Sequence, residues 1–105
     1  MTDPGTLNRR LTLEAPVETP DGAGGVARDY AAMATLWAEV TPIAARDNVV
    51  AAGLGATITH RIVIRVGPDI TTRHRFRDGA RVFRIATIRE RNKRFLEIHA
   101  EERTP

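Results

Sequence analysis

Three histidines, His60, His74 and His99, are the side chains of this sequence that could bind a metal ion or transfer a proton near neutral pH. A metal site would need two of them at a short spacing such as HxH or HExxH, because both rings must reach one ion. No such spacing occurs, and His60 and His99 are predicted at outward positions of strands. We therefore predict no metal site, no cofactor and no catalytic residue.

Nucleophilic catalysis is restricted further by the composition. The chain contains neither cysteine nor serine, which excludes a thiol nucleophile, a disulfide framework and a Ser–His–Asp triad. Its threonines have no neighbouring base in a recognisable arrangement, and its carboxylates are scattered without an obvious pair. The sequence therefore predicts a protein that binds or assembles and is not an enzyme.

Arginine dominates the charge pattern. The net charge is +3, and 15 of the 16 basic residues are arginine. Residues 60–94 contain 11 basic residues and three acids, a balance of +8, whereas the rest of the chain has five arginines and ten acids, a balance of −5. The basic half could face nucleic acid, because a guanidinium group binds phosphate at two points. Copies could also stack, basic surface on acidic surface, or the arginines could simply cover solvated strand faces.

The length of 105 residues fits a single domain. The first ten residues are polar and end in Arg9-Arg10, without the apolar stretch of a signal peptide. No apolar run approaches the roughly 20 residues that span a bilayer. We expect the protein to be made and kept in the cytoplasm, or in a particle assembled there, without contact to a membrane.

Short alternating segments between turn residues predict the strands that carry the arginines. These strands are expected over 9–15, 34–42, 59–66, a short segment closed by the hairpin pair Asp78-Gly79, 81–89 and 95–100. Pro16 is expected to end the first strand. The predicted connections are a flexible N-terminal arm (1–7), a glycine-rich loop (18–28), a long loop (43–57) in which Arg46–Ala52 could form a short helix, and a C-terminal tail (101–105).

The alternation also assigns faces. Ile62, Ile64 and Val66 are predicted to point inward, with Arg61 and Arg65 outward. The three phenylalanines, Phe76, Phe83 and Phe95, are predicted mostly in the core, and Trp37 is interpreted as a large anchor at the core margin rather than a platform for base stacking.

About six short strands with frequent turns predict one all-β domain over 1–105, a small antiparallel β-barrel with a long loop or short helix between its second and third strands. A basic barrel of this kind could be an OB-like nucleic-acid module. Such modules stack bases on aromatic side chains, and aromatic residues make up only 5% of this sequence. That interpretation is therefore the weaker one.

Several segments, taken in order, resemble a known family. They are "RRLTLEAPVET", "DGAGG", "LWAEVTPI", "THRIVIRVGPDI" and "RVFRIATIR". This succession resembles the phage head–tail joining proteins, also called head-closure or stopper proteins, of siphophages, prophages and phage-like gene transfer agents. The matching positions include Pro16 to Thr19, Asp21 to Gly25, Trp37 to Glu39 with Pro42, Thr59 to Ile62, Ile64-Arg65, and Arg81 to Phe83 with Ile85.

The resemblance implies a structural role. Family members form rings, commonly of twelve copies, between the portal or adaptor and the tail, and the ring extends the DNA channel. The implied partners are further copies of the chain, the portal or adaptor protein, a tail-terminator or tail-tube protein, and the double-stranded DNA that passes through. Whether this chain is the stopper or an adaptor stays open, and a small basic nucleic-acid-binding barrel is the alternative.

The resemblance also suggests where function lies. The long loop that closes the channel in some members corresponds to 43–57, with the candidate residues Arg46, Asp47, Asn48, Val49, Val50, Gly53, Leu54 and Gly55. The basic residues expected to face a neighbouring subunit or DNA are Arg61, Arg65, Arg73, Arg75 and Arg84. No catalytic residues are carried over from the family.

Overall fold

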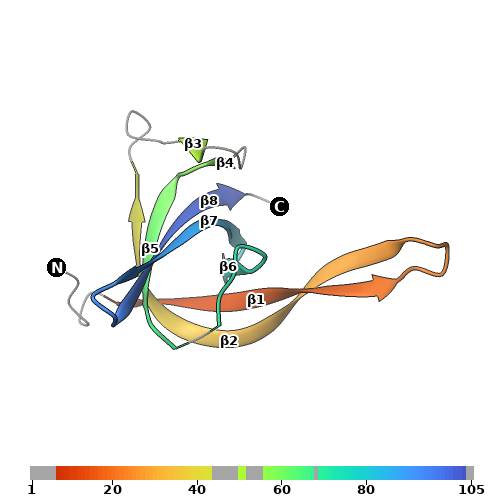
Figure 1. Ribbon diagram of the computed structural model, residues 1–105, viewed down its shortest axis with the longest axis horizontal. Helices are drawn as coiled ribbons and strands as arrows, with labels where there is room; N and C mark the ends of the chain where they lie inside the picture. Colours follow the sequence, from red (N-terminus) through yellow and green to blue (C-terminus); the bar gives the residue numbers. More distant parts are fainter. Residues whose placement is uncertain (1–6, 44–49, 52–55, 68, 104–105) are drawn as a thin grey trace.

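The computed structural model describes residues 7–43, 50–51, 56–67 and 69–103. Its strands are β1 (Arg9–Pro20), β2 (Val26–Pro42), β3 (Val50–Ala51), β4 (Ala56–Thr57), β5 (His60–Arg65), β6 (Arg75–Asp78), β7 (Arg81–Arg91) and β8 (Phe95–Arg103). Six of them close an antiparallel barrel in the order β1-β2-β5-β8-β7-β6, and β3 pairs with β4 separately (Figure 1). The predicted all-β barrel is confirmed.

No helix occurs in the described part of the chain, and so none there could cross a membrane. The short helix expected over Arg46–Ala52 falls mostly outside the described residues. The two residues of it that are described, Val50 and Ala51, form strand β3 and pair with Thr57 and Ala56. Of the candidate loop residues, only Val50 is described.

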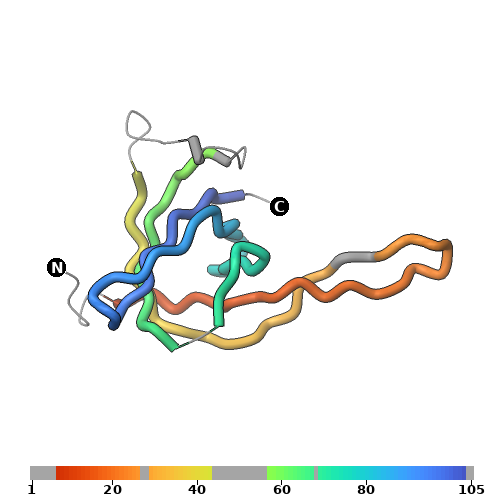
Figure 2. Tube along the Cα trace, viewed as in Figure 1, coloured from red at the N-terminus to blue at the C-terminus, as the bar shows by residue number. Residues whose placement is uncertain are grey.

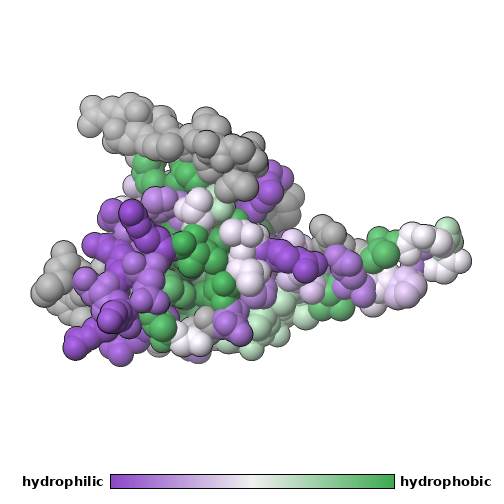
Figure 3. Space-filling view, in the orientation of Figure 1, coloured by the Kyte–Doolittle hydropathy of each residue, from purple (hydrophilic) through white to green (hydrophobic). Residues whose placement is uncertain are grey.

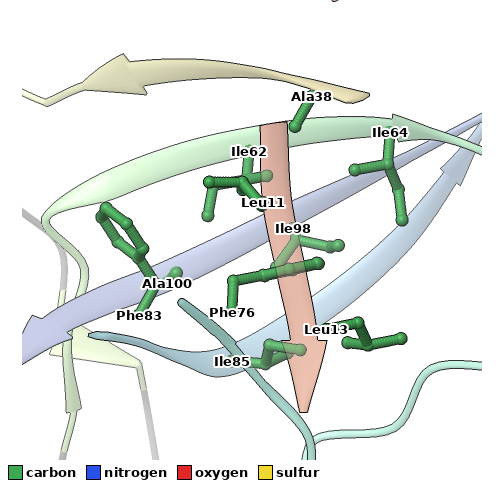
Figure 4. Close-up of a cluster of buried hydrophobic side chains, with 10 residues drawn as sticks. All are labelled: Leu11, Leu13, Ala38, Ile62, Ile64, Phe76, Phe83, Ile85, Ile98 and Ala100. Carbon is green, nitrogen blue, oxygen red and sulfur yellow. The ribbon is translucent and has the colours of Figure 1, made fainter. Parts of the chain in front are cut away.

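The interior of the barrel is filled by alternate residues of its six strands, because successive side chains of a strand point to opposite faces. Ten buried residues form this core: Leu11, Leu13, Ala38, Ile62, Ile64, Phe76, Phe83, Ile85, Ile98 and Ala100 (Figure 4). They include the predicted inward residues Ile62 and Ile64 and the predicted core residues Phe76 and Phe83. The third phenylalanine, Phe95, is buried in a smaller cluster with Leu7 and Val63.

Strand β5 departs from its predicted facing at both ends. Val66, predicted inward, lies just past the end of the strand and is 46% exposed, because the barrel wall stops at Arg65. His60, predicted outward, is only 8% exposed and shares the inward face of Ile62 and Ile64. Its ring packs edge-on against Phe83 with the ring centroids 5.1 Å apart.

The largest difference from the sequence prediction is a hairpin formed by β1 and β2. Pro16 does not end the first strand, and the expected loop over 18–28 is mostly paired strand, from Glu18 opposite Arg28 to Pro20 opposite Val26. A proline is tolerated in an edge strand where its missing N–H faces no partner. The turn is short, since Asp21 Oδ1 accepts hydrogen bonds from the N–H groups of Ala23 and Gly25.

The outer half of this hairpin projects beyond the barrel as an arm (Figures 1 and 2). We define the arm as residues 15–31 of this hairpin, as distinct from the N-terminal residues 1–7. Within the described chain, β1 pairs with β6 only over Thr12–Glu14, and β2 pairs with β5 only over Ala38–Pro42. The arm residues are therefore paired with each other, and their outer edges meet no further strand among the described residues. The molecule extends 50 Å along its longest axis as a result.

Trp37 occupies an outward position of β2 opposite Arg10. It is 54% exposed, and the guanidinium carbon of Arg10 lies 5.5 Å from the centroid of its ring. The interpretation of Trp37 as an anchor at the core margin is therefore wrong. The alternation in "LWAEV" already places Trp37 opposite in phase to the buried Ala38, and the indole is held at the surface by a cation–π contact.

Candidate functional site

A row of charged residues crosses the outer surface of four neighbouring strands. The register places Glu14 of β1 beside Arg75 of β6, Arg75 beside Arg84 of β7, and Arg84 beside Glu101 of β8. The two arginines meet because the β6–β7 hairpin turns over only Gly79 and Ala80, and the positive φ of 61° at Gly79 suits such a tight turn. The acids at both ends of the row offset the repulsion between Arg75 and Arg84.

Arg75 is the most constrained member of the row. Its Nε donates to Glu14 Oε1 at 2.6 Å, and Arg77 Nε donates to the other carboxylate oxygen at 3.1 Å. The guanidinium carbon of Arg75 also lies 3.7 Å from the ring centroid of Tyr30 on β2. Glu14 is itself only 8% exposed. These contacts tie β6 to the base of the arm, because Glu14 and Tyr30 both belong to the hairpin.

The segment before β6 brings a further arginine to the same place. Thr71 and His74 close a turn in which the Thr71 N–H donates to His74 Nδ1 at 2.9 Å and the His74 N–H donates to the Thr71 carbonyl at 3.1 Å. Arg73, in this turn, lies 3.5 Å from Glu18 of the arm. The turn therefore crosses one face of the arm and encloses a hollow against the barrel wall.

This hollow is a basic groove of about 460 Å³. It is lined by Pro16, Tyr30, Thr72, Arg73, His74, Arg75, Val82, Arg84 and Arg103. Three of the four arginines pair with acids of the same chain: Arg73 with Glu18, Arg75 with Glu14 and Arg103 with Glu101. Among the described residues, Arg84 makes no hydrogen bond or ion pair, and so it is the cation of the groove that is left for a partner's anionic group.

The pKa of Glu101 reflects its place beside this groove. It is lowered chiefly by the hydrogen bond from the Thr57 N–H, then by that from Arg103, with a smaller effect from the charge of Arg84. Glu101 therefore stays ionised and partly screens the groove. No group of three potential metal ligands occurs in the described parts of the chain. The basic groove could bind an anionic group, and the residues that line it form no recognisable catalytic arrangement.

The structure divides the basic residues that the sequence analysis singled out. Arg73, Arg75 and Arg84 come together in the groove. Arg61 and Arg65 lie on β5, away from it, and the Nε of Arg61 is buried without a partner in the described residues. Arg103 and Tyr30 were not predicted from the sequence as site residues, because β8 runs three residues past its expected end at Ala100 and β2 begins eight residues before its expected start at Ala34.

A second polar cluster lies at one end of the barrel interior. Arg81 Nε donates to Glu102 Oε2 at 2.8 Å, and Arg81 Nη2 lies 3.4 Å from His60 Nε2. His60 Nδ1 lies 2.9 Å from Thr59 Oγ1, which also accepts from the Glu102 N–H at 2.8 Å. When Thr59 Oγ1 donates to the Ala100 carbonyl, it can accept from His60 Nδ1–H, and His60 Nε2 can accept from Arg81. A neutral His60 with its proton on Nδ1 therefore satisfies each polar group of the cluster. The pKa of His60 is lowered, chiefly by burial, while Glu102 raises it and Arg81 lowers it.

This cluster predicts a pH-dependent stability. Because the folded-state pKa of His60 lies below its unfolded value of about 6.5, the unfolded chain binds the proton first as the pH falls. The wild-type protein should lose free energy of unfolding as the pH drops below about 6.5. In His60→Gln this loss should be smaller, because the substitution removes the buried imidazole whose pKa is lowered on folding. Urea denaturation between about pH 7.5 and about pH 5, above the range of the carboxylates, measures the difference. Parallel curves for the two proteins would contradict the prediction.

Comparison with known proteins gives a consistent picture. A family model described as phage head completion protein matches residues 2–103. Two similar solved structures are a chain from the virion of a native gene transfer agent particle and the solution structure of a protein from Shigella flexneri 2a. The first is 37% identical, with a TM-score of 0.68, and the match covers 94% of this chain and 97% of that one. The second is 27% identical, with a TM-score of 0.73, and covers 96% of each chain. No match is found among curated proteins.

Proposed function

The chain belongs to the phage head completion protein family, and from this we propose that it is a structural connector of a phage or gene-transfer-agent particle. In this proposal it is a virion component that joins the portal or adaptor complex of the head to the tail. The observation that carries the proposal is the match over nearly the whole chain, together with 37% identity to a chain of a gene transfer agent virion. The proposed role is structural and not enzymatic.

We further propose that copies of the chain form a ring, of twelve copies by resemblance, through which packaged DNA passes into the tail. The fold supports an assembling role because the arm has open strand edges that the rest of the described chain does not pair. Closure of the channel by the 43–57 segment is the part of this proposal that rests on the family resemblance alone. In the assembled particle the chain would be either the stopper ring or a neighbouring adaptor ring.

The proposal is tested in cells that produce the particles. The gene is removed and the particles are counted by electron microscopy, with the wild-type chain supplied in trans as control. We expect filled heads without tails, and tailed particles again after complementation. Affinity purification of the tagged chain followed by mass spectrometry should recover portal, adaptor or tail proteins. Normal yields of tailed particles in its absence would overturn the proposal.

A small nucleic-acid-binding barrel is the second candidate, and the basic groove with its unpaired Arg84 is the observation in its favour. A monomer with this function would bind double-stranded DNA with an affinity that falls steeply as salt rises. Under the connector proposal, we expect fluorescence anisotropy to show no tight, salt-sensitive binding by the monomer and no difference between the wild type and Arg84→Ala. Binding in the micromolar range that Arg84→Ala weakens by about tenfold would favour the second candidate.

A further inference from the structure

The barrel side covers only the inner part of one face of the arm, since Val26 further along that face is 62% exposed, and it leaves the other face free. Tyr30, opposite Pro16, lies under Arg75, and Glu18 of the same face pairs with Arg73. The other face carries the cross-strand pairs Ala15–Ala31 and Val17–Asp29, and Thr19 beyond them. We call these five residues the free face. Val17, its largest apolar side chain, is 42% exposed.

A projecting two-stranded ribbon of this kind is a site at which a partner can bind. An isolated hairpin is marginally stable in water, and unpaired strand edges are the sites at which proteins associate. Figure 3 shows mostly near-neutral and hydrophobic residues toward the tip of the arm, and hydrophilic residues nearer its base and over the opposite end of the barrel. Among the described residues, the arm is therefore a segment whose outer strand edges pair with no other strand and whose apolar side chains Val17 and Val26 are exposed.

The opposite end of the molecule carries a complementary hollow. This end pocket, of about 610 Å³, is lined by Leu7, Asn8, Leu36, Trp37, Ile64, Arg65 and Val66. Trp37 and Val66 are its exposed apolar side chains. An exposed tryptophan beside an arginine is the composition of an interface anchor, because tryptophan buries much area with few rotatable bonds and arginine can bind a carboxylate at two points.

The charges of the two surfaces are opposite. The arm carries three acids, Glu18, Asp21 and Asp29, against one base, Arg28, a balance of −2 over residues 15–31, and Glu18 already pairs with Arg73. The end pocket is flanked by Arg10 over Trp37, contains Arg65, and lies beside the basic β7–β8 turn, where the Val66 N–H donates to the Arg94 carbonyl at 2.9 Å. An acidic ribbon with an exposed valine thus matches an apolar pocket with a basic rim.

These two surfaces cannot meet within one molecule. Trp37 pairs with Arg10 at the start of β1, and Val17 lies seven residues further along the same strand. At about 3.3 Å per residue, roughly 23 Å of straight strand separates them. A surface at one end of a chain that fits a different surface at the other end makes a head-to-tail contact, and repetition of that contact closes a ring if the rotation allows it.

We propose that the free face of one copy's arm docks in the end pocket of the next copy, with Val17 against Trp37 and Val66 and with Asp29 facing Arg65. The occupant of the pocket is therefore a second copy of this chain. This inference rests on the proposed ring and names the surfaces that would build it.

Cross-linking in assembled particles tests the contact, and the absence of native cysteine makes it specific. The variant Val17→Cys/Val66→Cys, treated with a short bismaleimide, should give a ladder of cross-linked multimers on denaturing gels. Val26→Cys/Val66→Cys is the matched control, because Val26 lies on the other face of the arm opposite Pro20. The control and each single cysteine variant should give no ladder. A ladder of equal strength in the control would overturn the proposed face.

A charge exchange provides an independent test. Asp29→Arg alone should lower the yield of tailed particles by about tenfold or more, because it places two like charges in the contact. Arg65→Asp alone should act similarly, and the double variant should restore the yield. If the double variant restores nothing and no ladder forms, while the wild-type chain is still found at the particle neck, the docking mode is overturned and the connector function stands. If the wild-type chain is absent from particles, both fail.

Discussion

Replacing Phe83 by alanine is expected to lower the free energy of unfolding by about 3–5 kcal/mol. The Phe83 side chain is completely buried at the centre of the barrel, where Phe76 lies directly across the β6–β7 ladder. Its ring also contacts the ring of His60 edge-on and lies 5.1 Å from the guanidinium carbon of Arg81. Removal of the ring leaves a cavity and weakens the support of the His60 cluster. A closed barrel of hydrogen-bonded strands cannot collapse far to fill that cavity.

Urea denaturation at neutral pH measures this loss. Domains of this kind have total stabilities of about 5–15 kcal/mol, and so a substantial unfolded fraction is possible even without urea. The exposed Val26→Ala is a suitable control, with an expected change within about 0.5 kcal/mol. A loss below about 1.5 kcal/mol in Phe83→Ala would mean that neighbouring side chains repack into the cavity and that the core is less tightly packed than the burial of Phe83 indicates.

The barrel was predictable because its signal is local. Alternation in β5 identifies Ile62 and Ile64 as inward, and both are buried in the core. The Asp78-Gly79 pair identifies the β6–β7 turn, which in turn places Arg75 beside Arg84. Two of the candidate basic residues, Arg75 and Arg84, therefore lie side by side for a reason that the sequence contains, namely the short hairpin that joins them, whereas Arg73 reaches the same groove from the turn before β6.

The arm was not predictable by the same means. Pro16, Pro20 and the glycines after Asp21 are ordinary loop residues, and only the register of β1 on β2 shows that they stand in a projecting ribbon. The burial of His60 likewise depends on partners far along the chain, since Arg81 and Glu102 reach it from β7 and β8. Such contacts depend on which strands become neighbours in the closed barrel, and no local pattern states this.

Glu14 shows how one such long-range contact positions the proposed interaction surface. Its carboxylate is nearly buried, and it accepts hydrogen bonds from both Arg75 and Arg77. Replacing it with glutamine keeps the shape but removes the charge and turns one acceptor atom into a donor that faces a guanidinium group. We expect Glu14→Gln to lower the free energy of unfolding by about 2 kcal/mol, the range for hydrogen bonds to charged groups.

The effect should stay below the roughly 3–5 kcal/mol seen when a fully buried ion pair loses one partner, because both arginine side chains remain partly accessible to water. Urea denaturation measures the loss, and Glu90→Gln, at an exposed position of β7, is the matched control with an expected change within about 0.5 kcal/mol. A double-mutant cycle with Arg75→Met isolates the pair. A coupling near zero would show that Arg75 is held by Tyr30 alone.

The same substitution should loosen the arm more than the barrel. Arg75 belongs to the barrel strand β6, contacts Tyr30 of the arm and is oriented by the Glu14 carboxylate, and so loss of the Glu14 charge frees the guanidinium that fixes the base of the ribbon. Hydrogen exchange should therefore accelerate at the amides of β1 and β2 beyond Glu14, while the amides that pair β5 with β8 keep their protection. Equal acceleration in both places would mean that the arm and barrel open as one unit. Selective acceleration would mean that a single buried carboxylate sets the direction in which the free face is presented to the next copy.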